Sequence, residues 1–463
     1  MARITFALEL PAPVAKALGE AGISARNVAV WVQGVDEKAP LVEHNARRPM
    51  NPASVMKLLT TYAALEILGP AHSWKTEALI EAPLAGGRLA GDLILRGSGD
   101  PRLALEQFWL FLRQLRMRGL RDIEGDLVLD RGAFSLPPHD PAEFDQAPLR
   151  PYNAGPDALL VNLKSLRFIL HPDTGDPGRA RVDVWSETPG ADRLLRNELE
   201  PGRGRCGDWR ERLEIGVEGE TIALRGNYPA SCGDQALSLS PWPADFQVEQ
   251  LFRALWRELG GTLRGRVRDG STPPGARVFA AHESPTLAEI VREINKYSNN
   301  VMARQVFLTL DEARPATPEG ARRAVAAWLS DKGIAMPELV LDNGSGLSRG
   351  ERVTAEGLAR LLLAAWQSPV MPEFLSSLPL VGVDGTLRKR LSGNPIAGRA
   401  HLKTGYLGDA RALAGYVLGD GGKRWIVIFL INDPRARSGN PAMDALLEWL
   451  MGRVPGPEAS IRR

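Results

Sequence analysis

The sequence predicts an α/β fold of the α+β type, with an antiparallel sheet flanked by helices and a smaller β-rich insertion. Strand-like apolar runs lie near both ends of the chain, at 27–32 and within 400–431, so both ends are expected to supply strands to one sheet. Long helix-like stretches follow residues 54 and 286. The segment 161–237 is poor in helix signals and rich in Gly, Pro and Arg, which indicates an inserted, mostly β module.

The N-terminal part begins with a helix-like segment and a hairpin. A helix is expected over 11–21, a buried strand over 27–32 and a returning strand over 40–43. This hairpin leads into a helix that follows Pro52 and ends at Gly69-Pro70. Because that helix is largely apolar, we expect it to be buried and to lie on the sheet.

Beyond Gly69-Pro70 the chain changes to short apolar pieces separated by glycine. Two of them, Gly91-Asp92-Leu93 and Gly125-Asp126-Leu127, look alike but are too short to establish a repeat. The expected strands cover 75–80, 91–97, 125–130, 167–170, 182–185, 221–224 and 278–281, and the expected helices cover 105–118 and 246–259.

From Ser284 the chain returns to long helices. Thr286 and Glu289 form a T-x-x-E capping box at the start of the first helix, and Thr354 is the expected cap of a later one. Ser298-Asn299-Asn300 interrupts the helical region. Further helices are expected over 301–308, 322–329, 354–366 and 443–451, and strands separated by glycine turns over 400–404, 413–418 and 425–431.

Size and composition bound the class of protein. A chain of 463 residues exceeds what one core usually organises, so two or three domains are expected. The formal charge of +2, without a basic stripe interleaved with aromatics, argues against nucleic acid as a partner. No apolar run is long enough for a transmembrane helix, so membrane association is peripheral at most. The first twenty residues lack a long apolar centre and are not expected to form a signal peptide.

The strongest chemical signal is the S-x-x-K pattern of Ser54 and Lys57. Residues three apart share a helix face, so the hydroxyl and the amine can meet over the first turn. A lysine shielded from water loses its proton more easily and can then activate the serine as a nucleophile. The alternative is that Ser54 caps the helix and Lys57 extends to solvent.

Two later stretches complete a set with this pair. The Ser298 hydroxyl can relay a proton between Lys57 and a leaving group, and the Asn300 amide can bind a substrate carbonyl and the lysine. The alternatives are that the asparagines simply end a helix, or that Tyr297 and Asn299 form a Y-x-N motif in place of the serine. The order S-x-x-K, S-x-N, K-T-G is the signature of serine enzymes that react with penicillin and with D-Ala-D-Ala peptides.

The third stretch, Lys403-Thr404-Gly405, follows a predicted strand. Its amine and hydroxyl can hold a substrate carboxylate, and Gly405 leaves room for the substrate against the backbone. The N–H groups of Tyr406 and Ser54 are candidates for an oxyanion hole. The alternative is an exposed strand lysine before a turn.

Other kinds of site lack support in the sequence. The histidines are scattered and form no H-E-x-x-H, and no phosphate-binding loop with the required spacing occurs. No metal or cofactor is therefore expected.

Nearly the whole chain resembles the D-Ala-D-Ala carboxypeptidase/endopeptidase family of class C low-molecular-mass penicillin-binding proteins, the penicillin-binding protein 4 (DacB) type, peptidase family S13. Besides the three motifs, the resemblance rests on the long interval between Ser54 and Ser298. It also rests on the stretches 50–58, 97–101 (G-S-G-D-P), 342–349 (D-N-G-S-G-L-S-R) and 383–387 (V-D-G-T-L).

The resemblance implies a domain organisation and a role for each motif residue. The family fold implies a penicillin-binding, transpeptidase-like domain at 1–75 and 284–463, with inserted domains at 76–160 with 238–283 and at 161–237. The implied roles are nucleophile for Ser54, base for Lys57, relay pair for Ser298 and Asn300, and carboxylate anchors for Lys403 and Thr404.

Family members also bind the free amino acid end of the peptide's diamino acid through an arginine and an aspartate. Here the candidates are Arg349 and, in the inserted domain, Asp145. The residues after K-T-G, Tyr406-Leu407-Gly408, depart from the small polar residues expected there, so the preferred peptide side chain stays open.

The sequence thus predicts a periplasmic or otherwise extracytoplasmic serine DD-peptidase. Its expected partners are peptidoglycan stem peptides, with β-lactams as covalent inhibitors; the oligomeric state stays open. A β-lactamase or esterase on the same fold and a catalytically inactive peptidoglycan-binding protein are the alternatives. An oxidising compartment would allow Cys206 and Cys232, the only cysteines, to form a disulfide, and two unpaired buried thiols are the other possibility.

Overall fold

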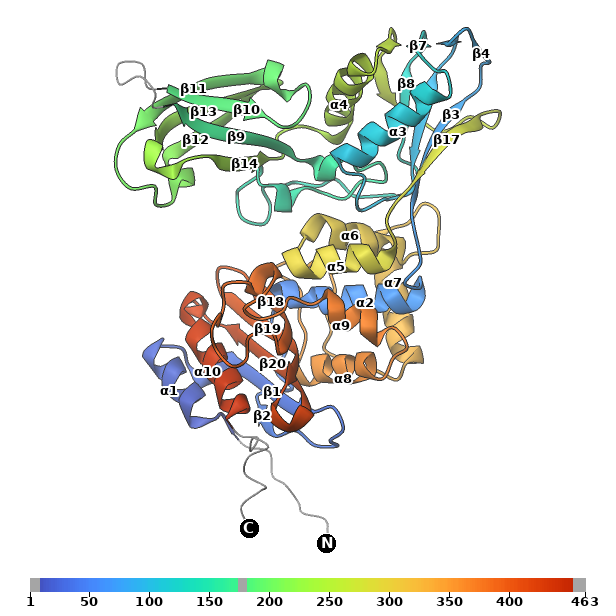
Figure 1. The fold of residues 1–463 in the computed structure, drawn as a ribbon. Helices are drawn as coiled ribbons and strands as arrows, with labels where there is room; N and C mark the ends of the chain where they lie inside the picture. The colour runs from blue at the N-terminus through green and yellow to red at the C-terminus, as the bar shows by residue number, and fades with distance from the viewer. Residues whose placement is uncertain (1–8, 174–180, 453–463) are drawn as a thin grey trace. The chain divides into compact units, whose positions relative to one another are not determined.

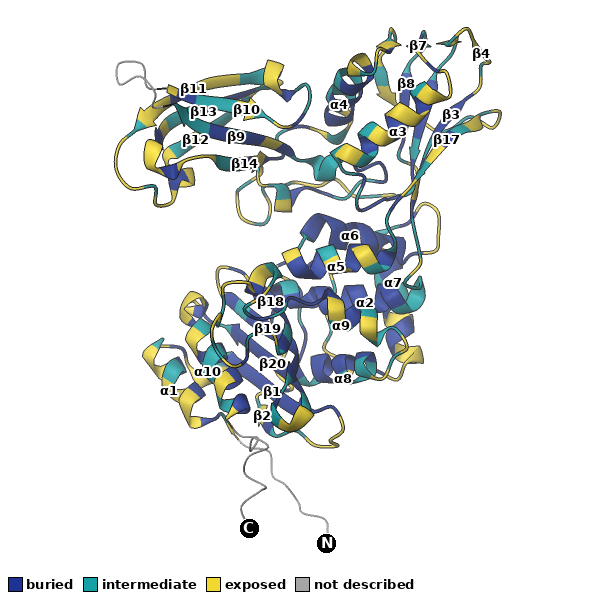
Figure 2. Cartoon of the chain, in the orientation of Figure 1, coloured by how far each residue is buried: buried dark blue, intermediate teal, exposed yellow. Residues whose placement is uncertain are grey.

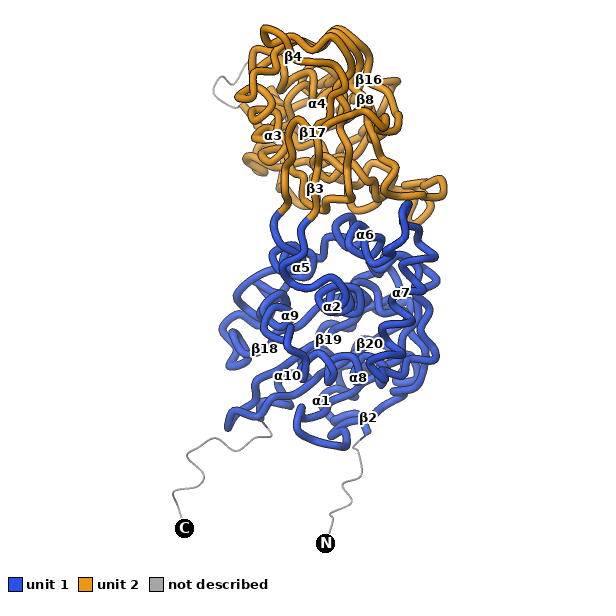
Figure 3. Tube along the Cα trace, turned by 90° about the vertical axis from the view of Figure 1, so that its right-hand side faces the viewer, with its two compact units in different colours: residues 1–73, 285–463 blue, residues 74–284 orange. Residues whose placement is uncertain are grey.

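The computed structural model describes residues 9–173 and 181–452, and Figure 1 shows helices and several sheets. The prediction that the first twenty residues are no signal peptide falls partly on 1–8, which lie outside the described residues. The chain forms two compact units, Met1–Ser73 with Pro285–Arg463, and Trp74–Ser284 (Figure 3). The division of the second unit into two inserted domains stays a prediction. Within the described ranges, no helix is both long and apolar enough to cross a membrane.

The first unit is built on one antiparallel sheet with strands from both ends of the chain, which confirms the predicted fold. Its order is β18-β19-β20-β1-β2. All seven residues of β1 are buried because α8 covers one face of the sheet and α1 and α10 the other (Figures 1 and 2). The strands are β1 (Val28–Gly34), β2 (Val42–His44), β18 (Ala400–Tyr406), β19 (Ala410–Leu418) and β20 (Arg424–Asn432).

The helices of the first unit largely follow the predicted pattern. The capping box at Thr286 is present, and the Thr354 hydroxyl accepts the N–H of Gly357 at the start of α8. Helix α9 was not predicted. The helices are α1 (Ala12–Glu20), α2 (Lys57–Ile67), α5 (Leu287–Tyr297), α6 (Asn300–Thr309), α7 (Pro318–Asp331), α8 (Ala355–Trp366), α9 (Met371–Ser377) and α10 (Asn440–Met451).

The segment that carries Ser54 differs from the expected single helix on the sheet. Ser54 lies in a 3₁₀ turn, Ala53–Met56, that packs on β18 and β19, and α2 begins only at Lys57. Helix α2 packs mainly against α5, α6 and α7. The physical reason is that α2 is apolar on nearly every side, so helices must cover the faces that a sheet cannot reach.

The second unit contains a five-stranded sheet of order β16-β8-β6-β3-β17, with α3 (Leu105–Met117) and α4 (Ala244–Glu258) in the same hydrophobic cluster. Its strands are β3 (Lys75–Ile80), β6 (Leu93–Gly97), β8 (Leu127–Asp130), β16 (Val267–Asp269) and β17 (Arg277–Glu283). A small sheet joins β4 (Leu84–Ala85), β5 (Arg88–Leu89), β7 (Asp122–Ile123) and β15 (Thr262–Leu263).

The two similar G-D-L pieces are neighbours in this sheet. Leu93 pairs with Leu127 in parallel register, and Val267 pairs with Leu127 on its other side. The Asp92 carboxylate accepts the N–H of Asp126, and Asp126 accepts that of Arg266 in the same way. The two G-D-L pieces therefore look alike because the aspartate of each one accepts a backbone N–H from the next strand segment.

The β-rich part of the second unit consists of two three-stranded sheets around one hydrophobic cluster that includes Phe168, Trp209 and Tyr228. The strands β11 and β12 were missed because charged and exposed residues dilute their apolar pattern, and the short strand β14, which has no charged residue, was missed as well. The first sheet contains β9 (Leu166–Asp173), β10 (Arg181–Ser186) and β14 (Gln235–Leu239), and the second β11 (Leu195–Gly202), β12 (Leu213–Glu218) and β13 (Thr221–Pro229).

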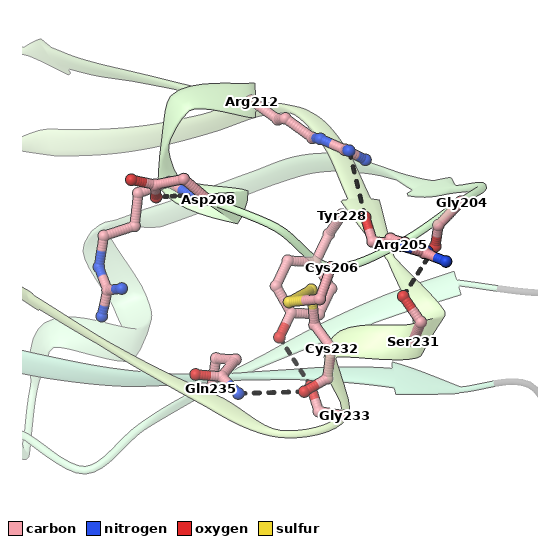
Figure 4. Close-up of a disulfide and its surroundings, with 11 residues drawn as sticks. Gly204, Arg205, Cys206, Asp208, Arg212, Tyr228, Ser231, Cys232, Gly233 and Gln235 are labelled. Atoms are coloured by element: carbon pink, nitrogen blue, oxygen red, sulfur yellow. Dashed lines mark hydrogen bonds between the residues drawn. A yellow bond between two sulfur atoms is a disulfide. The ribbon is translucent and has the colours of Figure 1, made fainter. Parts of the chain in front are cut away.

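Cys206 and Cys232 form a disulfide in this part (Figure 4). It joins the segment between β11 and β12 to the turn that follows β13. The neighbouring Tyr228 hydroxyl donates to the carbonyl of Gly233 at 2.7 Å, which holds the same turn. The open question of the two thiols is thus settled in favour of the bridge.

We expect replacement of both cysteines by alanine to lower the free energy of unfolding by about 3 kcal/mol, because the unfolded chain regains the freedom of the loop that the bridge closes. Urea unfolding followed by tryptophan fluorescence measures this. Dithiothreitol should destabilise the unaltered protein to a similar extent and leave the Cys206→Ala/Cys232→Ala variant unchanged. Equal midpoints for the oxidised protein and the variant would show that the bridge contributes nothing.

Candidate active site

Ser54 and Lys57 lie side by side at the start of α2. The Lys57 Nζ donates to the Ser54 Oγ at 3.1 Å. The 3₁₀ turn explains the contact, since side chains at i and i+3 eclipse one another in that geometry. Ser54 is half-buried, whereas Lys57 is completely buried.

The Lys57 amine has two further hydrogen-bond partners. It donates to Asn300 Oδ1 at 2.6 Å and to the carbonyl oxygen of Ser345. Burial, reinforced by the nearby charge of Lys403, holds the pKa of Lys57 well below its usual value. A neutral amine has two N–H groups and one lone pair, and the two carbonyl oxygens can only accept. The lone pair of neutral Lys57 is therefore directed at the Ser54 hydroxyl.

The S-x-N stretch forms the break between α5 and α6. Ser298 adopts a left-handed conformation with φ 57°, and the Asn299 side chain accepts the N–H of Met302 as the cap of α6. Asn300 is the first residue of α6 and reaches Lys57. Tyr297 is 72% exposed. The geometry therefore favours Ser298 and Asn300 over the alternative Y-x-N register, whose asparagine is used as a helix cap.

Lys403 connects the K-T-G strand to this break. Its Nζ donates to Ser298 Oγ at 2.9 Å and to the carbonyl of Thr404 at 2.7 Å. Burial lowers the pKa of Lys403 to about 7. The Thr404 hydroxyl is 3.0 Å from that of Thr386, so the V-D-G-T-L stretch also contacts the K-T-G strand. A second buried amine and three hydroxyls are thus grouped at the strand that packs on the Ser54 turn.

Beyond its first residues, which pair with the 379–381 segment, the outer edge of β18 can bind an extended peptide. Strand β18 is the last in its sheet, and the Leu407 N–H donates to the Ala410 carbonyl of β19 at 2.9 Å. Since N–H groups alternate in direction along an antiparallel strand, those of Tyr406 and Thr404 point away from β19. The Tyr406 N–H is therefore on the side where a substrate strand could pair.

The packing of β18 requires a glycine at position 405, in addition to the predicted room for substrate. A Cβ at this position would lie 2.6 Å from the Pro52 carbonyl oxygen and 2.9 Å from the Ala53 Cβ. The lack of a side chain thus lets β18 approach the turn that carries Ser54.

We expect Gly405→Ala to slow acylation of Ser54 by about 100-fold, because the methyl group pushes the strand away from the serine turn. The second-order rate of labelling by a fluorescent penicillin measures this. Gly408→Ala is the matched control, since a Cβ there has no atom within 4 Å. Equal effects of the two substitutions would contradict the packing argument.

Arg349 and Asp145, the candidates for binding the diamino acid, lie in different units. Arg349 is exposed in the first unit, with its guanidinium 3.2 Å from Asp409. Asp145 is exposed in the second unit, and its two oxygens accept from Tyr152 and Asn153, each at 2.7 Å. Asp145 therefore has a local structural role, and its part in substrate binding stays a prediction.

Sequence reasoning missed several residues that support the site. The Ser345 carbonyl binds Lys57, and Lys296 pairs with Asp384 at 2.7 Å next to the Ser298 break. Glu351 is completely buried. The 342–349 and 383–387 stretches were recognised as family-like, but a motif gives no sign of a backbone carbonyl's role or of a buried charge in a hydrophilic segment.

Comparison with known proteins gives one consistent result. The model of the D-Ala-D-Ala carboxypeptidase 3 (S13) family matches residues 10–451. The D-alanyl-D-alanine carboxypeptidase of Actinomadura sp. (strain R39) is 32% identical, over 80% of this chain and 71% of that protein. The D-alanyl-D-alanine carboxypeptidase DacB of Haemophilus influenzae is 25% identical, over 88% of this chain and 85% of the relative.

The fold also matches a solved structure. Penicillin binding protein 4 (dacB) from Haemophilus influenzae superposes with a TM-score of 0.77 and 23% identity, covering 94% of this chain and 99% of the other. A second structure of that protein, complexed with a novel β-lactam, gives a TM-score of 0.75, with 23% identity, over 95% of this chain and 100% of the other. The likeness extends over both compact units.

Proposed function

Because the chain belongs to the D-Ala-D-Ala carboxypeptidase 3 (S13) family, a serine peptidase family, we propose that it cleaves D-Ala-D-Ala stem peptides of peptidoglycan through an acyl-enzyme on Ser54. The predicted family and enzyme class, a serine-type D-Ala-D-Ala carboxypeptidase, are confirmed. The observation that carries the choice of nucleophile is the Lys57 amine, held between one hydroxyl and two carbonyl oxygens.

The first step is acylation. Neutral Lys57 takes the proton of Ser54 while Oγ attacks the carbonyl carbon of the penultimate D-Ala. The negative charge that develops on the carbonyl oxygen is stabilised by the backbone N–H groups of Ser54 and Tyr406. The bond to the terminal D-Ala nitrogen then breaks, and the proton from Lys57 passes to that nitrogen, with the Ser298 hydroxyl as relay.

The second step is deacylation. A water molecule attacks the ester, its proton returns through Lys57 to Ser54 Oγ, and the shortened peptide leaves. Both steps use the same base, so the low pKa of Lys57 serves acylation and deacylation alike.

Substrate orientation follows from the K-T-G strand. Lys403 and the Thr404 hydroxyl bind the terminal carboxylate, and a bound anion favours the charged form of a Lys403 whose pKa is lowered by burial. The substrate backbone pairs with the outer edge of β18. The exposed Arg349 binds the free end of the diamino acid, which extends the reaction to D-Ala-diamino acid cross-links as an endopeptidase. A β-lactam carries a carboxylate beside a reactive carbonyl and acylates the same serine.

An extracytoplasmic location agrees with this substrate. The Cys206–Cys232 disulfide supports it, because such bridges persist in oxidising compartments. The bacterial relatives named above are called D-alanyl-D-alanine carboxypeptidases.

The proposal is tested by incubating the protein with benzylpenicillin and measuring its intact mass, together with release of D-Ala from a synthetic stem pentapeptide. We expect a stable adduct of one penicillin per chain, located on the peptide that contains Ser54, and free D-Ala from the pentapeptide. Rapid turnover of penicillin without a lasting adduct would identify a β-lactamase. An absent adduct and no D-Ala release would indicate an inactive binding protein.

A further inference from the structure

Glu351 is a fully buried acid behind the active site, although Arg349 and Gly350 just before it are exposed. Its Oε1 accepts the backbone N–H groups of Asp342 and Asn343 at 3.3 and 3.2 Å. The other oxygen, Oε2, is buried and has no hydrogen-bond partner among the described residues. A charged carboxyl in this position carries a large desolvation cost.

The backbone held by Glu351 leads directly to the catalytic amine. The Asn343 Oδ1 accepts the N–H and the hydroxyl of Ser345 at 3.0 and 2.6 Å. The Gly344 carbonyl accepts the Thr60 hydroxyl of α2 at 2.6 Å. The Ser345 carbonyl in turn accepts from Lys57. One turn, 342–346, thus connects the buried carboxyl to the group that orients the lysine.

The same turn lies against the nucleophile. A Cβ on Gly346, whose φ is 79°, would lie 2.0 Å from the carbonyl oxygen of Ala53. A displacement of the turn therefore moves either the Ser345 carbonyl or the backbone next to Ser54.

Glu351 also balances the charges around the base. Lys57, Lys403 and Arg304 are three basic side chains with little or no exposed surface. Burial, Lys403 and Arg304 lower the pKa of Lys57, and Glu351 raises it. Burial, together with the Asp342 charge, raises the pKa of Glu351 itself to about 7.

We infer that Glu351 is a positioning residue for acylation, which holds the 342–346 turn so that the Ser345 carbonyl orients Lys57, and which supplies a negative charge among the buried basic groups around Lys57. The inference rests on the proposed function. Glu351 is fully buried and acts only through the turn and through its charge.

The sign of the pH effect follows from the charges. Acylation requires neutral Lys57, so its rate rises with pH through the apparent pKa of the lysine and its coupled neighbours. Glu351 favours the protonated amine. Removal of its charge lowers this pKa further, and the rise in rate must move to lower pH.

The test is the pH profile of the second-order rate of acylation by a fluorescent penicillin. For Glu351→Gln, whose amide oxygen can still accept the two N–H groups, we expect the acidic limb to move down by about 0.5–1 pH unit. The plateau should fall about tenfold, because a neutral amide oxygen holds the two N–H groups of the turn more weakly than a carboxylate does. Glu338→Gln removes an exposed acid of the same unit and should match the unaltered protein.

Thr60→Val tests positioning alone, because it removes the hydroxyl bound to Gly344 without changing a charge. We expect slower acylation with an unmoved acidic limb. Thr60→Val therefore tests whether the 342–346 turn positions Lys57, even if Glu351→Gln fails to fold. If Glu351→Gln lowers the acylation rate equally at every pH without moving the acidic limb, the role of the Glu351 charge is overturned. If Thr60→Val acylates at the unaltered rate, the positioning role of the turn is overturned. No acylation of the unaltered protein would refute the proposed function, and the inference with it.

Discussion

Ser54→Ala is expected to remain folded and to lose the penicillin adduct entirely, with D-Ala release from a stem pentapeptide reduced by at least about 10⁴-fold. The hydroxyl oxygen is the atom that forms the acyl bond, and it lies 3.1 Å from the Lys57 amine. Intact mass after benzylpenicillin treatment and a coupled assay for free D-Ala measure the two effects. The loss of one half-buried hydroxyl removes little packing, so the thermal midpoint should barely change.

Ser376→Ala is the matched control for this experiment, because it removes an exposed serine hydroxyl of the same unit. It should retain both the adduct and the peptidase activity. A full adduct on Ser54→Ala would place the nucleophile elsewhere and remove the basis of the mechanism.

Lys57→Met is expected to reduce the acylation rate by about 10³-fold, within the range that general bases contribute. Methionine has a similar length and fills the buried space, but it cannot take the serine proton. Two opposing changes keep the effect on stability small. The desolvation cost of a buried amine disappears, while Asn300 Oδ1 and the Ser345 carbonyl lose their donor.

The acylation rate of Lys57→Met should also lack the rise with pH that the unaltered protein shows, because the group that titrates is gone. Stopped-flow labelling between pH 5 and pH 9 measures both effects, and Lys38→Met, which replaces an exposed lysine, is the control. An unchanged pH dependence would mean that another group is the base, with Lys403 as the first candidate since burial lowers its pKa to about 7.

Much of the fold follows from local pattern. The strand 75–80 has the predicted limits and the helix from Leu105 begins where predicted, because alternation and a 3.6-residue period are visible in short windows. The strands β11 and β12 were missed because their charged residues satisfy one another across the sheet, as Arg196 does with Glu218. Such pairing depends on the tertiary structure, so a strand that it stabilises need not show a hydrophobic pattern in the sequence.

The sequence by itself determined the chemical groups of this protein: a hydroxyl and an amine three residues apart, an S-x-N break between helices, and a K-T-G strand. Their types and spacings depend only on the covalent chain and on helix geometry. The tertiary structure alone decided the environment of each group. Lys57 is a usable base because folding buries it beside Lys403 and directs two carbonyl oxygens at its amine. Glu351 is buried, and its carboxylate accepts two N–H groups of the 342–346 turn. Desolvation and hydrogen-bond direction arise from contacts between segments hundreds of residues apart, and no local pattern records them.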